Sequence, residues 1–300
     1  MNRAIFEALL AGLKTFNLGW NLAKSAVLWP AFRSRGYCTE FPPAKRIMVL
    51  APHMDDEVIG CGGAIHRHAR RGGRTTCVFL TNGAAGLSGA ERESVYATRR
   101  RESGRAALIL GIDRLVFCGR PDGRLKSDPD LERRIRDIID EERPEILLLP
   151  YPFDPHPDHR AAFGVLADAT RAMPESEIHL LLYQIRTPIP WRTISVVLDI
   201  SHELSAKHEA FAAFASQPER TFKTVLHLGS CQRFLIGVKP RAVEVFASLS
   251  LSNAGRVGYN LPFQGPQVSR ILCVGRHALR RGRLLHTHPL KEADGWKNIA

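Results

Sequence analysis

Short apolar runs alternate with longer amphipathic segments from residue 46 onward. The runs predict buried strands at 47–51, 76–80, 115–117, 146–149, 178–185 and 194–199. The segments between them predict helices at 57–71, 88–110, 130–142 and 202–216. Strands that are apolar throughout and alternate with helices indicate a mostly parallel sheet covered on both faces. We therefore expect an α/β three-layer sandwich.

The two ends of the chain have different patterns. Residues 3–29 carry apolar side chains at three- and four-residue spacing and predict an amphipathic helix. Such a helix either packs on the rest of the protein or lies in a membrane interface, and the sequence leaves both open. The chain beyond 250 is rich in Gly, Pro and Arg and has no clear period. We expect a helical extension at 1–40, one folded domain at 41–250 and a basic irregular extension at 251–300.

The composition is that of a folded protein with an excess of basic residues. The 300 residues include 42 Lys and Arg against 30 Asp and Glu, which gives a formal charge of +12. A positive charge favours anionic neighbours such as phosphates or a membrane surface. The basic segment 276–283 has no interleaved aromatic residues, so we expect no nucleic-acid partner. The oligomeric state is left open.

Cysteine usage and the absence of targeting signals bear on the location. The six cysteines form no C-x-x-C pair, and several lie in apolar runs, which is typical of buried reduced thiols. The first thirty residues lack a secretory pattern, and no apolar stretch is long enough to span a bilayer. We expect a cytoplasmic protein, with peripheral membrane contact through residues 1–30 as an open alternative.

Two clusters of metal-ligand side chains follow the first and fourth predicted strands. The first cluster is 52–57, PHMDDE, and the second is 154–159, DPHPDH. Both lie at the carboxyl ends of parallel strands, the edge at which open α/β sheets bind ligands. Two imidazoles and a carboxylate suit zinc, and a catalytic zinc keeps a position for water. We expect His53, Asp56 and His159 to be the ligands, because one turn separates the first two and the third approaches from the other loop.

The remaining side chains of the two clusters predict a hydrolytic site. Zinc lowers the pKa of water to about 7, so a carboxylate is a sufficient proton acceptor, and Asp55 is placed for this role. An amide carbonyl under attack needs a hydrogen-bond donor, and the leaving amine needs a proton. We expect His156 to serve both needs, with Asp158 orienting its ring. Gly60, Cys61, Gly62 and Gly63 do not form a dinucleotide loop, since Ile65 stands where the last glycine would be required.

At these residues the chain resembles the LmbE-like family of N-acetylglucosaminyl-phosphatidylinositol de-N-acetylases and related amino-sugar deacetylases. The resemblance covers about residues 45–220. The family motif A-H-P-D-D-E corresponds to residues 52–57, PHMDDE, in which Met54 stands where proline is usual. The motif H-P-D-H is intact at 156–159. Phe214 stands where the family commonly has a histidine.

The resemblance implies a Rossmann-like sheet, zinc ligation by His53, Asp56 and His159, Asp55 as the general base, and His156 as oxyanion stabiliser or acid. It adds an R-x-x-E motif at Arg99 and Glu102 and an acidic loop at Asp122. By this similarity Arg99 and Asp122 contact the sugar. The implied function is zinc-dependent removal of an acetyl group from an N-acetylglucosamine-type sugar in a glycoconjugate. In one form of this expectation the sugar is linked to a lipid. The alternatives are hydrolysis of a different amide and a non-catalytic sugar-binding protein of the same fold.

Overall fold

The computed structural model describes residues 40–171, 173, 178–190, 193–217 and 242–250. The helix predicted at 3–29 and the basic extension after 250 lie outside these residues, so the division of the chain into three parts remains a prediction. No helix within the described ranges has both the length and the apolar character needed to cross a bilayer.

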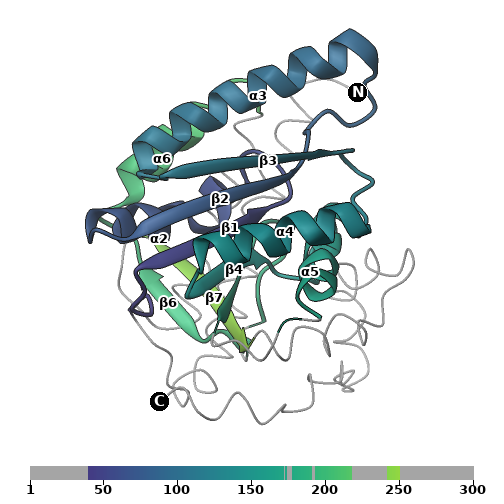
Figure 1. Cartoon of the computed structure of the whole chain (residues 1–300). Helices are drawn as coiled ribbons and strands as arrows, with labels where there is room; N and C mark the ends of the chain where they lie inside the picture. The colour runs from purple at the N-terminus through teal and green to yellow at the C-terminus, as the bar shows by residue number, and fades with distance from the viewer. Residues whose placement is uncertain (1–39, 172, 174–177, 191–192, 218–241, 251–300) are drawn as a thin grey trace, which may run out of the picture.

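A sheet of seven strands forms the middle layer of the described part (Figure 1). The strand order is β3-β2-β1-β4-β5-β7-β6. The first five strands in this order are parallel to one another, and β7 is antiparallel to both of its neighbours, β5 and β6. The expected α/β class with a mostly parallel sheet is confirmed. The strands are β1 Arg46–Ala51, β2 Arg74–Thr81, β3 Arg114–Arg120, β4 Ile146–Pro150, β5 His179–Tyr183, β6 Val196–Asp199 and β7 Val243–Ser250.

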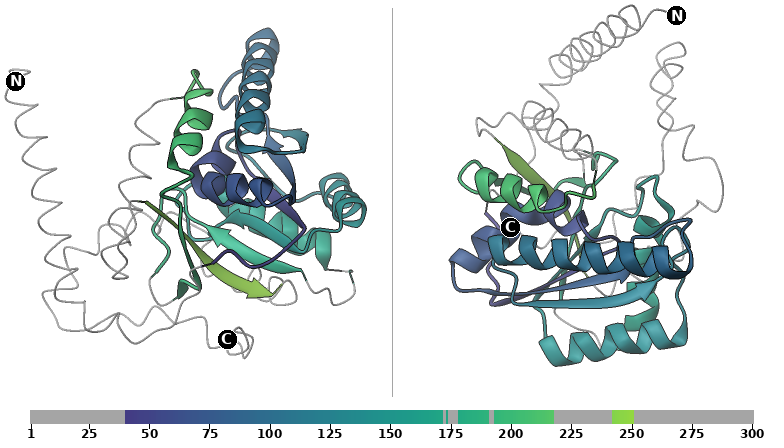
Figure 2. Two further views of the ribbon diagram at one scale, coloured as in Figure 1. Left: turned by 90° about the vertical axis from the view of Figure 1, so that its left-hand side faces the viewer. Right: turned by 90° about the horizontal axis from the view of Figure 1, so that it is seen from above.

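Helices cover both faces of this sheet (Figure 2). Successive side chains of a strand pack against the helices on opposite faces of the sheet. Val49 of β1 packs against one helical layer, and Met48 and Leu50 pack against the other. All three side chains are fully buried, which is why β1 reads as an uninterrupted apolar run. The first layer contains α2 Asp56–Arg70, α3 Gly89–Leu110 and α6 Leu204–Ala212, and the second contains α4 Pro129–Glu142 and α5 Pro157–Thr170.

The order of the strands reverses at β1. The chain adds β2 and β3 on one side of β1 and then crosses to add β4 on its other side. In register, Val49 of β1 lies opposite Leu148 of β4. Loops that leave the carboxyl ends of two such strands diverge to opposite faces and leave a crevice between them. The two ligand-rich loops follow these two strands.

Two elements were not predicted from the sequence. Helix α5 begins at Pro157, inside the second ligand-rich cluster, where the run of Pro, Asp and His suggested only a loop. Its N-cap is His156, whose ring accepts a hydrogen bond from the Asp158 amide. Strand β7 carries buried Glu244 as its second residue, and an interior carboxylate obscures the apolar run that marks a strand. The part of the chain expected to be irregular begins after β7.

Helix α2 is interrupted at Cys61, whose φ and ψ of −145° and 20° are not helical. The glycines beside it allow close packing. A Cβ on Gly60 would lie 2.1 Å from the ring of Tyr183, and a Cβ on Gly63 would lie 2.6 Å from Ile200. The glycine-rich segment therefore lets the broken helix sit directly on β5 and on the segment after β6.

A buried ion pair satisfies the backbone groups that this interruption frees. Lys207 of α6 donates to the carbonyl of Ile59 at 2.8 Å and to Glu244 of β7 at 2.5 Å. Glu244 accepts the amides of Gly63 and Ala64, both at 2.8 Å. In an unbroken helix the Gly63 amide would donate to the Ile59 carbonyl. The pair thus replaces backbone hydrogen bonds lost at the break.

Removing Lys207 should be costly, because it leaves the charge of Glu244 and the carbonyl of Ile59 buried without this partner. We expect Lys207→Met to lower the free energy of unfolding by about 3–5 kcal/mol, measured by urea denaturation. Arg133→Met, which breaks the exposed pair with Asp130, is the matched control and should cost less than about 1 kcal/mol. A loss below about 1 kcal/mol for Lys207→Met would contradict this role of the ion pair.

Candidate metal centre and active site

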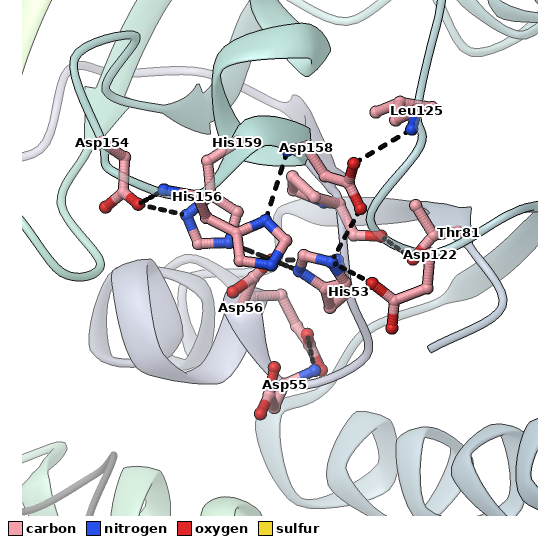
Figure 3. A network of polar contacts seen from close by, with 12 residues as sticks. His53, Asp55, Asp56, Thr81, Asp122, Leu125, Asp154, His156, Asp158 and His159 are labelled. Carbon is pink, nitrogen blue, oxygen red and sulfur yellow. Dashed lines mark hydrogen bonds and ion pairs between the residues drawn. The ribbon is translucent and has the colours of Figure 1, made fainter. Parts of the chain in front are cut away.

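Three ligand-type side chains from the two loops meet above the sheet edge (Figure 3). His53 lies in the turn after β1, Asp56 begins α2 and His159 lies in the first turn of α5. His53 Nδ1 is 3.2 Å from Asp56 Oδ2, His159 Nε2 is 3.4 Å from the same oxygen, and the two ring nitrogens are 3.3 Å apart. Segments about a hundred residues apart in sequence therefore present three donor atoms at one point.

This triangle has the dimensions that a tetrahedral zinc requires. With bonds of 2.0–2.2 Å, two ligand atoms of a tetrahedral zinc lie about 3.3–3.5 Å apart. The three distances fall close to this edge length, and all three residues are at least nine-tenths buried. Two looser groupings, whose ligand atoms lie within 4.8 Å of one another, combine His53 and His156 either with His159 or with Asp122 and Asp158. The residues fit a metal ion, and the tightest set is the one expected from the sequence.

Carboxylates on the far side hold the ring of His53. Its Nε2 lies 3.1 Å from Asp122 Oδ1 and 3.2 Å from Asp158 Oδ2, so Nδ1 is the atom that faces Asp56. Asp158 in turn accepts the amides of Gly123 at 2.6 Å and Leu125 at 3.0 Å. Burial alone would lower the pKa of His53, but its hydrogen bonds with the three carboxylates raise that pKa well above its usual value.

His159 is held in the same way by Asp154, a residue to which the sequence reasoning gave no role. His159 Nδ1 makes a 3.0 Å ion pair with Asp154 Oδ1, which leaves Nε2 for the centre. Asp154 is 1% exposed and also accepts the amides of His156 and Arg186. Burial lowers the pKa of His159, but the charge of Asp56 and the contact with Asp154 raise it to about 9. Only its place two residues before His156 signals this role in the sequence.

Asp56 is the carboxylate common to both histidines. Burial would raise its pKa, but the charge and hydrogen bonds of His159 and His53 hold that pKa well below the usual value. Its Oδ2 also accepts the amide of His53 at 2.9 Å. The ionised carboxylate therefore supplies the negative charge that a divalent cation requires.

Asp55 adopts a strained backbone conformation beside this cluster. Its φ of 144° makes it, with Arg143, one of two non-glycine residues with positive φ in the described part of the chain. The Asp55 amide donates to Glu57 Oε2 at 3.1 Å, and Glu57 is fully buried. Burial and the charge of Asp56 raise the pKa of the Asp55 carboxyl to about 7. A carboxyl group with such a pKa can exchange protons near neutral pH.

The His156 ring lies over the ring of His53, with the two centroids 4.5 Å apart. Its Nδ1 accepts the Asp158 amide at 3.2 Å, so the neutral ring carries its proton on Nε2. Burial and the positive charges of His53 and His159 lower its pKa to about 4. From the sequence we expected the Asp158 carboxylate to orient the His156 ring. In the structure that carboxylate contacts His53, and only the Asp158 backbone amide reaches His156, because α5 begins between the two residues.

The two predicted sugar contacts lie at the side of the site nearest β2 and β3. Asp122 contacts His53 and accepts the Ala85 amide at 3.3 Å, so its carboxylate is already held in place. The Arg99 side chain packs over Gly83, and its guanidinium donates to the Gln217 side-chain oxygen at 2.6 Å when that amide is oriented to receive it. Contact of these two residues with a sugar remains a prediction.

The second residue of the R-x-x-E motif has a structural contact. Glu102 is buried one turn beyond Arg99 on α3 and accepts the amide and hydroxyl of Ser216 at 2.9 and 2.6 Å. Together Arg99 and Glu102 fasten the segment after α6 to α3. Phe214, which stands where the family commonly has a histidine, is 2% exposed in the apolar core. It therefore packs in the core rather than contributing a polar group to the site.

Comparison with known proteins agrees with this geometry. Residues 48–170 match the family model PIG-L, described as GlcNAc-PI de-N-acetylase. A Bacillus cereus protein named as a probable N-acetyl-α-D-glucosaminyl L-malate deacetylase 2 is 30% identical over 186 residues, which are 58% of this chain and 84% of the relative. The chain belongs to the PIG-L (LmbE-like) family.

Other members of the PIG-L family match over a shorter part of their length. The chain covers 62% of a Bacillus anthracis protein of the same name at 34% identity, and 53% of the diacetylchitobiose deacetylase of Thermococcus kodakarensis at 32% identity. These matches extend over 44% and 45% of this chain. The chain therefore spans little more than half of these relatives.

Two further matches show the breadth of the PIG-L family. The conserved protein TT1542 from Thermus thermophilus superposes with a TM-score of 0.56 at 29% identity, covering 67% of this chain and 93% of that one. A 4-oxalmesaconate hydratase of Pseudomonas putida is 33% identical over 45% of this chain and 55% of its own length. Membership alone thus does not fix the reaction.

Asp154 allows a test of how the ligands are held. Removing the charge beside a metal-bound histidine typically lowers metal affinity about 10- to 100-fold. We expect this loss for Asp154→Asn, measured as the zinc dissociation constant by competition with a chromogenic chelator. The exposed Asp130→Asn is the control and should bind zinc as the wild type does. Unchanged affinity in Asp154→Asn would mean that this carboxylate does not support His159.

Proposed function

We propose that this protein is a metal-dependent N-deacetylase that removes the acetyl group from an N-acetylglucosamine-type sugar in a larger conjugate. The observation that carries the proposal is the triangle of His53, Asp56 and His159 with a buried, strained Asp55 beside it. Relatives that match this part of the chain are named as deacetylases. Both of their printed substrates are N-acetylated amino sugars, which supports the sugar class.

His53 Nδ1, Asp56 Oδ2 and His159 Nε2 would hold the ion, with zinc as the best match to two imidazoles and a carboxylate. When bound, a divalent zinc polarises the amide carbonyl and lowers the pKa of water. Asp122, Asp158 and Asp154 bind the far nitrogens of the two histidines and so fix their orientation. All other steps are carried by residues of the chain.

Asp55 acts as the proton acceptor in this proposal. Its carboxylate removes a proton from the water that attacks the acetyl carbonyl carbon. When the carbon–nitrogen bond breaks, the same carboxyl returns the proton to the nitrogen, so that free acetate and an amine leave. The pKa of about 7 suits a group that must accept and return a proton at neutral pH. The hydrogen bond from the Asp55 amide to Glu57 holds the strained turn that presents the carboxylate.

His156 supplies the hydrogen bond to the carbonyl oxygen. With Nδ1 occupied by the Asp158 amide, its Nε2–H is the free donor, and the oxygen gains negative charge as water adds. A pKa near 4 keeps the ring neutral at pH 7. The sequence reasoning gave His156 the further task of protonating the amine. A neutral imidazole is a weak proton source, so we assign that transfer to Asp55.

A lyase activity is the second candidate, because a family relative of similar identity is named as a hydratase. A hydratase adds water to a carbon–carbon double bond and releases no acetate. The same ligand cluster would serve either reaction, so the products decide between them. Hydrolysis of a different amide and sugar binding without catalysis are weaker candidates, since no described contact favours either. The expectation of a lipid-linked sugar depends on residues 1–30, outside the described part.

Acetate release tests the reaction. We expect the purified protein to free acetate from N-acetylglucosamine conjugates, and Asp55→Asn to lower kcat about 100-fold or more while retaining its metal. Enzymatic acetate assay and elemental analysis provide the two measurements, and Asp130→Asn serves as the exposed control. A variant at position 55 with wild-type turnover would refute the assigned role of Asp55. Metal-loaded protein that releases no acetate would refute deacetylation.

Chelation tests the metal dependence separately. Dialysis against a strong chelator should abolish acetate release, and added zinc should restore it, because the three side chains coordinate the ion reversibly. The Asp56→Asn variant should contain less zinc than the wild type. Its acetate release should not recover at the zinc concentration that restores the wild type. Full activity in protein shown to be free of metal would contradict the proposal.

A further inference from the structure

A groove of about 700 Å³ lies beside the metal centre, between α3 and the loops that follow β2 and β3. Asp122 belongs to both places, because its carboxylate contacts His53 and also lines the groove. Tyr96 of α3 forms part of the wall, and its hydroxyl lies over Gly119, where a Cβ would be 3.3 Å away. A substrate whose acetamide reaches the metal centre can therefore extend into this groove.

The face of α3 sets the length of the groove. Arg92, Tyr96 and Arg99 are four and three residues apart and share one side of the helix. Arg99 lies next to the metal centre, since its charge acts on both Asp55 and Asp122. Seven residues correspond to about 10 Å along a helix, so Arg92 lies that much further out along the groove than Arg99. The outer part of the groove is thus placed for the group attached to the sugar.

Two cations, Arg92 and Arg124, line the groove, and they differ in their partners. Arg92 makes a 3.2 Å ion pair with Glu93, and both side chains are largely exposed. The Arg124 guanidinium makes no ion pair or hydrogen bond with any residue in the described ranges. Arg124 therefore keeps a positive charge that contacts no carboxylate in the described part, while Asp122 in the same groove is held by His53.

The backbone on either side of Arg124 is fixed to the metal centre. The amides of Gly123 and Leu125 both donate to Asp158, whose carboxylate also contacts His53. Leu125 is 5% exposed and packs in the core, while Arg124 is exposed and lines the groove. The backbone of Arg124 is therefore held beside the metal centre, and its exposed side chain can reach into the groove. The guanidinium can donate two parallel hydrogen bonds to a carboxylate or phosphate.

We propose that this groove recognises a carboxylate or phosphate carried by the group attached to the sugar, with Arg124 as the residue that determines this specificity. The inference rests on the proposed deacetylase function and narrows its substrates to anionic conjugates. Arg92 adds a weaker contribution, because its charge is shared with Glu93. The anion binds equally in the ground state and the transition state, so Arg124 acts on KM rather than on kcat.

The test uses three glycosides of N-acetylglucosamine that differ in one group: methyl, carboxymethyl and 2-phosphoethyl. Binding to Asp55→Asn is measured by titration calorimetry, which needs no turnover, and kcat and KM are measured on the active protein. We expect the two anionic glycosides to bind about 10-fold or more tightly than the methyl glycoside. The comparison between the two anionic arms identifies which anion the groove prefers.

Arg124→Ala should remove this preference and leave the methyl glycoside unaffected. Arg124→Gln, which keeps the aliphatic stem, should behave in the same way, and Arg124→Lys should restore only part of the preference. Lys126→Ala is the matched control, because Lys126 is an exposed cation of the same loop that does not line the groove. It removes an equal charge and should keep the preference within about twofold.

The outcomes separate the two claims. An anionic preference that Arg124→Ala and Arg124→Gln abolish supports the inference, even if no glycoside releases acetate, and in that case the proposed function alone fails. Anionic glycosides that bind no more tightly than the methyl glycoside overturn the inference, whether or not acetate is released. Equal losses of the anionic preference in Arg124→Ala and Lys126→Ala also overturn the inference. They would show that the preference comes from the overall positive charge of the loop and not from a direct contact of Arg124.

Discussion

Two neighbouring parallel strands, β1 and β4, end at the same edge of the sheet, and the candidate site depends on this adjacency. His53 leaves the first strand and His159 follows the second, yet their ring nitrogens lie 3.3 Å apart. The strand order reverses at β1, with β2 and β3 on one side and β4 on the other, and this reversal places a crevice between the two loops. Mutual repulsion of two protonated imidazoles would oppose such an approach. Asp56 between them, and Asp122, Asp158 and Asp154 behind them, supply the compensating charge.

The interruption of α2 connects the core to this site. The half of the helix that carries Asp56 ends at the break, and the carbonyl of Ile59 near its end is held by Lys207 from α6. Glu244 from β7 holds the first amides of the second half. The short first half can therefore take its own direction toward the crevice while the longer half packs on the sheet. A continuous helix would tie Asp55 and Asp56 to a direction set by the core alone.

Much of the fold was predictable from the sequence, because buried strands have uninterrupted apolar runs. The run at 47–51 falls within one residue of β1, and the run at 146–149 within one residue of β4. Helix α5 escaped prediction because its first turn is built from the second ligand-rich cluster itself. Strand β7 escaped because its interior Glu244 is acceptable only with Lys207 opposite it, and that partner is 37 residues away along the chain. Pairings of this kind depend on tertiary structure and leave no local pattern.

The same distinction holds within the site. The proposed ligands could be chosen from the sequence, because suitable residue types follow two strands that end at one edge. The contacts of the supporting carboxylates could not be predicted. The carboxylate of Asp158 contacts His53, not the His156 ring, since the start of α5 turns this side chain toward the loop at 123–125. Asp154 supports His159 from a position at which the sequence shows only one more acidic residue.

Anomalous diffraction at the zinc edge, from crystals grown with zinc, tests the central claim most directly. We expect one strong peak about 2.0–2.2 Å from His53 Nδ1, an oxygen of Asp56 and His159 Nε2. A peak held by His53, Asp122, His156 and Asp158, or no peak between the two loops, would contradict the account.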